Sequence, residues 1–207
     1  MKIGANCIRI IRMKILLTLF IFLFSSSVLA DDISDFQIEG ISIGDSLLDY
    51  FSEEEIKNNV MKEYYQGFQD QSFVAIEFYN HSSFKTYESV QFNIKRNDKN
   101  YKIYSITAAN FYRDKIEECI LKLDEISKEF SILFQNVEHG VLEKRSHFID
   151  TTGQSYTLGF YYIFETNDAV VVECYDWSKK LTNEKGWIDK LSIALDTEEF
   201  SDWLHKQ

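Results

Sequence analysis

The alternation of apolar and polar positions predicts two groups of β-strands. Every second residue is apolar within 73–79 and 89–95, which is typical of a strand with one buried face. A polar turn at 96–100 precedes a long strand expected over 101–112. The second group is expected at about 142–149, 156–164, 169–177 and 187–195, with a short strand at 36–39 near the start. Turns at 150–153 and 166–168 are short enough for antiparallel hairpins.

A different period, close to 3.6 residues, marks one long helix over 114–135. Its apolar stripe consists of Ile116, Cys119, Ile120, Leu123, Ile126, Phe130, Leu133 and Phe134. Asp114 and Glu117 are expected to cap this helix, and Asp196 and Glu199 to cap a C-terminal one. Capping-box patterns at 46–49 and 52–55 predict short helices near the N-terminus. The order predicts an α+β fold: an antiparallel β-sheet with a long amphipathic helix packed on it, plus short N- and C-terminal helices.

The first 30 residues have the pattern of an export signal. Residues 15–24 are apolar, 25–30 offer a small-residue cleavage site ending at Ala30, and the basic residues before them are Lys2, Arg9, Arg12 and Lys14. This apolar-rich stretch of ten residues is too short for a bilayer span of about 20, although an uncleaved anchor is the alternative. Translation could also start at Met13. We expect a periplasmic or secreted protein with a single domain over 31–207.

The net charge of the predicted mature chain disfavours some classes of binding partner. Cleavage near Ala30 leaves 18 basic against 33 acidic residues, a net charge of −15. Such a surface repels phosphate backbones and anionic lipid, so nucleic-acid binding is disfavoured, and the mature chain contains no predicted membrane span. It suits cations or a basic protein or small ligand. The alternative is an acidic surface that only maintains solubility.

Two cysteines remain in the predicted mature chain. Cys119 lies on the apolar stripe of the long helix, and Cys174 shares a strand face with Val170 and Val172. Both thiols are therefore expected to face the core between helix and sheet, which favours a disulfide in an oxidising compartment. Two buried thiols that never meet are the alternative.

Two short strings near the N-terminus are similar to serine-hydrolase motifs. Residues 40–44 fit G-x-S-x-G around Ser42, and residues 44–47 spell G-D-S-L, which resembles a family of lipases and esterases. That resemblance implies Ser46 as nucleophile, His205 as base and Asp202 as its orienting acid, because Asp202 and His205 form D-x-x-H.

Several features of the sequence disagree with this esterase hypothesis. The family's G-x-N-D block is absent, and its parallel sheet differs from the antiparallel one predicted here. Ser46 is expected to be a helix N-cap facing Asp49. On the C-terminal helix, the helical period places Asp202 and His205 opposite an apolar stripe of Phe200, Trp203 and Leu204.

A different candidate site lies on the strand expected at 169–177. Glu173, Tyr175 and Trp177 share the face opposite Cys174, where an aromatic surface beside an acid would suit a cationic ligand or a basic partner. The alternative is that a second layer buries all three. The histidines show no metal-binding spacing, so no metal or other cofactor is predicted.

The strings S-D-F-Q-I-E-G-I-S-I-G-D-S-L-L-D-Y-F, E-E-C-I-L-K-L-D-E-I and V-V-V-E-C-Y-D-W resemble a group of small exported proteins of marine alphaproteobacteria with no assigned function. The resemblance implies a shared fold and an export signal, and it supplies no catalytic residue. A fainter similarity, in I-G-D-S-L-L-D-Y-F, is to the first helix of small envelope proteins of the outer-membrane assembly type. We therefore expect an exported domain that acts by binding.

Overall fold

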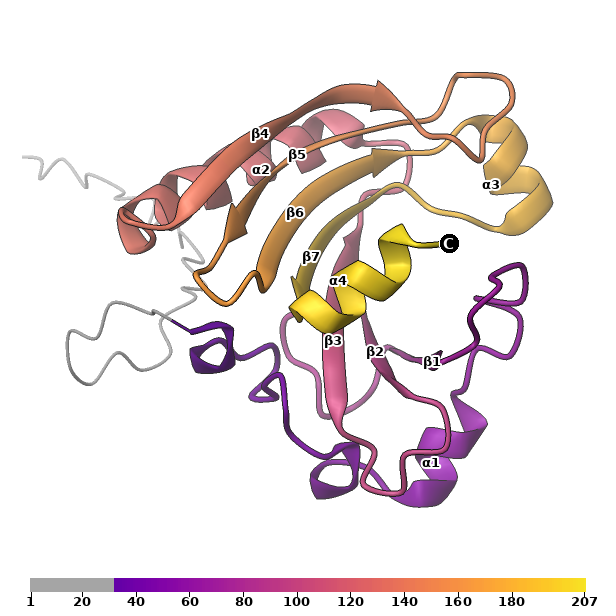
Figure 1. The fold of residues 1–207 in the computed structure, drawn as a ribbon. Helices are drawn as coiled ribbons and strands as arrows, with labels where there is room; N and C mark the ends of the chain where they lie inside the picture. Colours follow the sequence, from indigo (N-terminus) through magenta and orange to yellow (C-terminus); the bar gives the residue numbers. More distant parts are fainter. Residues whose placement is uncertain (1–31) are drawn as a thin grey trace, which may run out of the picture.

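The computed structural model describes residues 32–207, so the predicted signal segment lies outside the described residues (Figure 1). The strands form a single antiparallel sheet in the order β1-β2-β3-β7-β6-β5-β4. Their bounds are β1 (Phe73–Tyr79), β2 (Ser89–Lys95), β3 (Ile103–Phe111), β4 (Glu138–Ser146), β5 (Tyr156–Ile163), β6 (Ala169–Asp176) and β7 (Lys190–Asp196). The predicted α+β class with an antiparallel sheet is confirmed.

The helices are α1 (Glu53–Asn58), α2 (Ile116–Leu133), α3 (Lys179–Lys185) and α4 (Glu198–His205), with short 3-10 turns at Ile33–Asp35 and Leu47–Asp49. The capping box predicted at 52–55 is present: the Ser52 hydroxyl accepts a hydrogen bond from the Glu55 amide, and the Glu55 carboxylate accepts one from the Ser52 amide. No helix within residues 32–207 has the length and apolar character that a bilayer span requires.

One face of the sheet, here called the α2 face, is covered except along the edge strand β4. Because side chains alternate along a strand, Val170, Val172 and Cys174 of β6 all point toward α2, and all three are fully buried. Over β1 and β2 the cover is the N-terminal segment, where the Phe51 ring stacks on Phe78 with centroids 4.2 Å apart. This side therefore holds the main hydrophobic core.

The opposite face, called the α4 face, is covered over only part of its width. Phe200 and Trp203 of α4 pack on Phe73 of β1, with ring centroids 5.3 and 4.9 Å apart, and Tyr65 closes this smaller core. Figure 1 shows α4 lying in the hollow of the curved sheet, in front of β3, while α2 lies behind the upper strands. No described helix packs on the α4 face over β4–β6. We call that region, with the adjoining part of β7, the open face.

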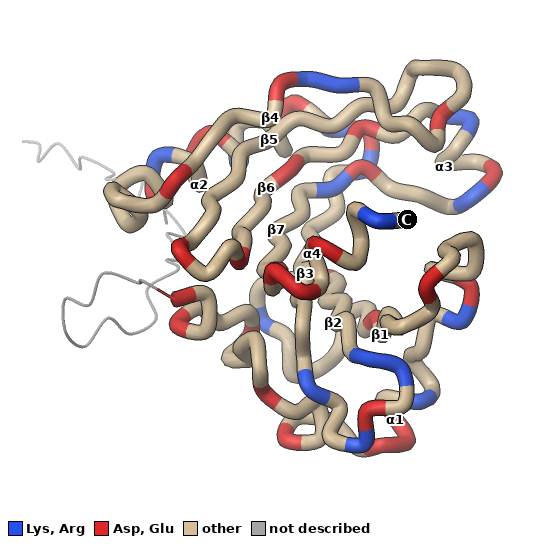
Figure 2. The backbone as a smooth tube through the Cα atoms, viewed as in Figure 1, with Lys and Arg blue, Asp and Glu red and all other residues tan. Residues whose placement is uncertain are grey.

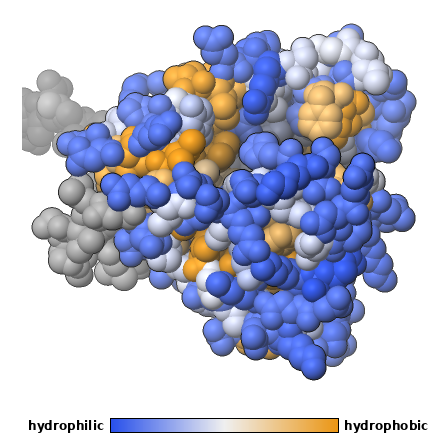
Figure 3. Space-filling view, viewed as in Figure 1, coloured by the Kyte–Doolittle hydropathy of each residue, from blue (hydrophilic) through white to orange (hydrophobic). Residues whose placement is uncertain are grey.

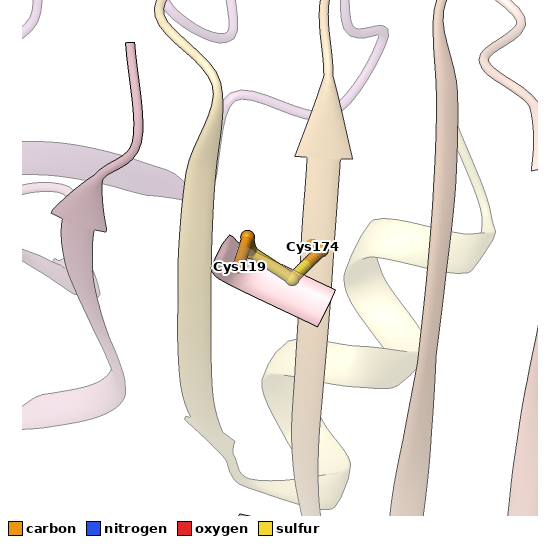
Figure 4. Close-up of a disulfide and its surroundings, with 2 residues drawn as sticks. All are labelled: Cys119 and Cys174. Atoms are coloured by element: carbon orange, nitrogen blue, oxygen red, sulfur yellow. A yellow bond between two sulfur atoms is a disulfide. The ribbon is translucent and has the colours of Figure 1, made fainter. Parts of the chain in front are cut away.

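The predicted disulfide is confirmed. Cys119 of α2 is bonded to Cys174 of β6, with Cα atoms 6.1 Å apart and a sequence separation of 55 (Figure 4). Both residues are completely buried. The bond therefore fixes the long helix to the centre of the sheet, on the face opposite Tyr175.

Two of the strand predictions differ from the structure. The fourth strand runs over Glu138–Ser146 rather than 142–149, because β4 is an edge strand with mostly exposed residues and a bulge between Leu142 and Arg145. The strand expected at 36–39 does not form. Ile38 and Ile41 make only an isolated bridge across a tight turn.

Helix ends also differ from the prediction. Asp114 does not cap α2: its backbone is left-handed, with φ at 61°, and its amide donates a hydrogen bond to the Asp189 carboxylate. Asp196 is the last residue of β7, and Thr197 caps α4 instead. Helix α3, which begins after the cap Ser178, was not predicted.

Candidate functional site

The three residues of the esterase hypothesis form hydrogen bonds with other groups. The Ser46 hydroxyl donates to the Asn100 carbonyl at 2.6 Å and accepts from the Leu48 amide. The His205 ring bonds to the Ser201 carbonyl of its own helix at 2.9 Å, and Asp202 pairs with Lys206 at 3.0 Å. Ser46 is thus the predicted helix cap, and no hydrogen bond links it to His205.

The hollow beside Ser46 also lacks the histidine that the esterase hypothesis requires. This open depression has a volume of about 570 Å³. Its lining residues are Gly44, Ser46, Lys95, Arg96, Asn97, Asp98, Asn100, Lys102 and Tyr104, with no histidine among them. Two of its cations already have partners, because Lys95 pairs with Glu199 and Arg96 donates to the Gln71 carbonyl. We find no catalytic arrangement there.

The predicted binding residues lie on the open face, where they join a larger group. Tyr175 and Trp177 stack with ring centroids 5.6 Å apart, and Trp177 also contacts Trp187 at 4.6 Å and His147 at 4.7 Å. Phe148 stacks on His147 at 4.9 Å. We call these five residues the aromatic cluster. Four are half-buried, and Phe148 is 88 % exposed, so the second layer considered as an alternative does not cover them.

The cluster is assembled from three separate segments. His147 and Phe148 begin the loop between β4 and β5. Tyr175 lies near the end of β6, Trp177 directly follows that strand, and Trp187 precedes β7. The loop ends beside α3 (Figure 1), where Figure 3 shows an apolar patch at the surface. The exposed apolar side chains of this loop are Phe148 and Ile149.

Buried carboxylates hold these segments in place. Asp150 accepts hydrogen bonds from the amides and hydroxyls of both Thr152 and Ser155, which keep its pKa well below its usual range. Asp189 accepts a hydrogen bond from the Trp177 amide at 2.8 Å. The two contacts fix the loop and the end of β6, so the rings are presented by rigid backbone.

Glu173 is not the free acid that the sequence suggested. It is 8 % exposed, and its two oxygens accept from Arg145 at 3.1 Å and from the Tyr175 hydroxyl at 2.8 Å. The neighbouring strand makes room for it, because a Cβ at Gly159 would stand 2.8 Å from the Glu173 Cγ atom and closer still to the Val172 carbonyl. Glu173 therefore orients Tyr175 and Arg145.

Four side chains on the open face lie in one row across four strands. Lys190 of β7 is opposite Tyr175 of β6, which is opposite Thr157 of β5, which is opposite Arg145 of β4. Figure 2 shows the corresponding charge pattern, with basic segments on β4 and β7 on either side of an acidic segment on β6. Burial raises the pKa of Tyr175 well above its usual range, so its hydroxyl stays protonated.

The sequence identified only part of this site. Tyr175 and Trp177 follow from the alternation along β6, whereas His147, Phe148 and Trp187 lie in connecting segments without a periodic pattern. Arg145 lies beyond the bulge of β4, which shifts its position relative to the preceding residues. The remaining signal was the density of aromatic residues near the ends of predicted strands.

No group of three or more histidine, cysteine or acidic residues is placed to hold a metal ion in the part of the chain from 32 to 207. Comparisons with family models, curated proteins and solved structures find no match to this chain. The site must therefore be interpreted from its own geometry.

Proposed function

We propose that this protein is a binding domain without chemistry of its own, and that the open face is its binding site. The observation that carries the proposal is the aromatic cluster: five rings from three segments, held by buried carboxylates and partly exposed at the surface. Rings of this kind stack against planar or apolar groups of a ligand, and they lose little conformational entropy on binding.

The neutral planar probe N-phenyl-1-naphthylamine tests this proposal directly, because its fluorescence rises in an apolar site. We expect Trp177→Ala to weaken probe binding about tenfold, since a lost stacking contact and its buried area correspond to about 1–2 kcal/mol. Phe148→Ala should weaken it by a smaller factor without affecting the fold, because that side chain is almost fully exposed.

Tyr50→Ala provides the matched control, because Tyr50 is also a surface aromatic residue, 42 % exposed, but belongs to the N-terminal segment. Its affinity for the probe should equal that of the wild type. Equal affinities for all four proteins, or no binding to the wild type, would contradict the proposed site.

We also propose that the chain is exported, as the sequence predicts. The buried disulfide supports this proposal, because such bonds form and persist in oxidising compartments. The intact mass of the protein recovered from the periplasm, measured without reduction, should correspond to a chain starting at Asp31 and lacking two hydrogens. A full-length mass in the membrane fraction would instead indicate an uncleaved anchor.

A further inference from the structure

Lys190 carries a positive charge on the open face without a direct counter-ion. Within residues 32–207 its ammonium makes no salt bridge and no hydrogen bond, and it lies over the Tyr175 ring, 5.2 Å from the centroid. The side chain is half-buried, and burial lowers the pKa of the Lys190 ammonium. A desolvated cation in this position is costly unless it has a partner.

The two carboxylates that face Lys190 are both engaged elsewhere. Glu173 accepts from Arg145 with one oxygen and from Tyr175 with the other. Glu77 of β1, which the curvature of the sheet brings into electrostatic range, accepts from the Ser89 hydroxyl at 2.6 Å. The negative charges of Glu77 and Glu173 raise the pKa of the Lys190 ammonium, but by less than burial lowers it. The ammonium thus retains hydrogen-bond donors for a group from outside the chain.

The aromatic side chains beside Lys190 restrict the shape of a ligand that binds to its ammonium. Tyr175 lies directly beside it in the row of paired strands, and Trp177 and Trp187 continue the aromatic surface beyond the strand ends. A ligand that reaches Lys190 therefore lies beside aromatic side chains at the same time. Planar apolar bodies suit such surfaces because they stack on the rings.

We propose that the open face binds a small anion with a planar apolar body, such as an aromatic carboxylate, whose acidic group accepts hydrogen bonds from Lys190 while its body stacks on Tyr175 and Trp177. This inference rests on the proposed function and adds the charge of the ligand. It differs from the basic partner suggested by the sequence because Glu173, the acid of that hypothesis, is already paired.

Two probes that differ by one charged group separate the inference from the proposed function. The sulfonate 8-anilino-1-naphthalenesulfonate has the same ring systems as N-phenyl-1-naphthylamine, which is neutral. We expect the wild type to bind the sulfonate about tenfold more tightly, since a charge-assisted hydrogen bond contributes roughly that factor. Lys190→Gln should remove this preference and change the affinity for the neutral probe less than twofold.

Lys190→Arg should retain most of the preference, and Lys122→Gln, on the exposed side of α2, should retain all of it. Urea unfolding of each variant verifies that it is folded. The ratio of the wild-type affinities for the sulfonate and the neutral probe tests the anion inference without any variant. If both probes bind equally, and Lys190→Gln alters neither affinity, the anion inference is wrong and the binding site stands. If neither probe binds, the proposed function is wrong as well.

Discussion

Replacing Cys119 and Cys174 together by alanine is expected to lower the free energy of unfolding by about 4 kcal/mol, since the bond closes a loop of 55 residues. Single domains are stable by about 5–15 kcal/mol, so this loss is a large fraction of the total. The melting temperature should fall by roughly 8–16 °C for a domain of this size. Both residues are fully buried, and the small void left by the missing sulfur atoms adds to the loss.

Urea unfolding with and without dithiothreitol measures the effect and provides its control. Reduction should shift the midpoint of the wild type toward that of the double variant, and it should leave the midpoint of the variant unchanged. Equal midpoints for oxidised and reduced wild type would show that α2 remains on the sheet without the bond. The open face would then not depend on an oxidising compartment for its stability.

Asp196→Asn is expected to stabilise the protein at pH 7 by about 2–3 kcal/mol. Asp196 is the last residue of β7, and one of its oxygens, Oδ1, is buried without a hydrogen-bond partner. Burial raises the pKa of its carboxyl group from 3.8 to about 6, and the Ser105 hydroxyl opposes this shift only in part. Ser105 is completely buried and also accepts a hydrogen bond from Asn93.

The direction of the pH dependence follows from the difference between the pKa of Asp196 in the folded protein and its pKa in the unfolded chain. Between pH 3.8 and about 6 the folded protein retains a proton on Asp196 that the unfolded chain has already released. The contribution of this group to stability is therefore lost as the pH rises through that window, and the loss is complete above it. The asparagine variant, which cannot ionise, should match the wild type near pH 4 and exceed it at pH 7.

Unfolding measured from pH 4 to pH 7 tests this difference, with Asp202→Asn as the control. Asp202 is an exposed acid of α4 paired with Lys206, and such surface pairs contribute at most about 1 kcal/mol. A loss of stability in Asp196→Asn at pH 7 would mean that the carboxylate is charged and paired in the folded protein.

The strands that the sequence located best are those with a regular apolar alternation on one face. Residues 73–79 and 89–95 match β1 and β2 because their alternating apolar residues pack on the main core, although part of the opposite face of both strands is buried as well. β4 was displaced by four residues at its start because an edge strand with both faces wet has no such alternation. The same alternation placed Cys174 toward the helix and Tyr175 away from it.

The sequence alone was enough to locate the long helix and most of the strands, to identify the apolar face of each, and to place Cys119 and Cys174 in the same core. These properties follow from local periodicity. The position of β7 between β3 and β6, which brings Lys190 beside Tyr175, and the packing of α4 over β3 rather than over β4–β6 were not predictable in this way. Strand order and coverage depend on contacts between residues far apart in the chain, and no local pattern specifies them.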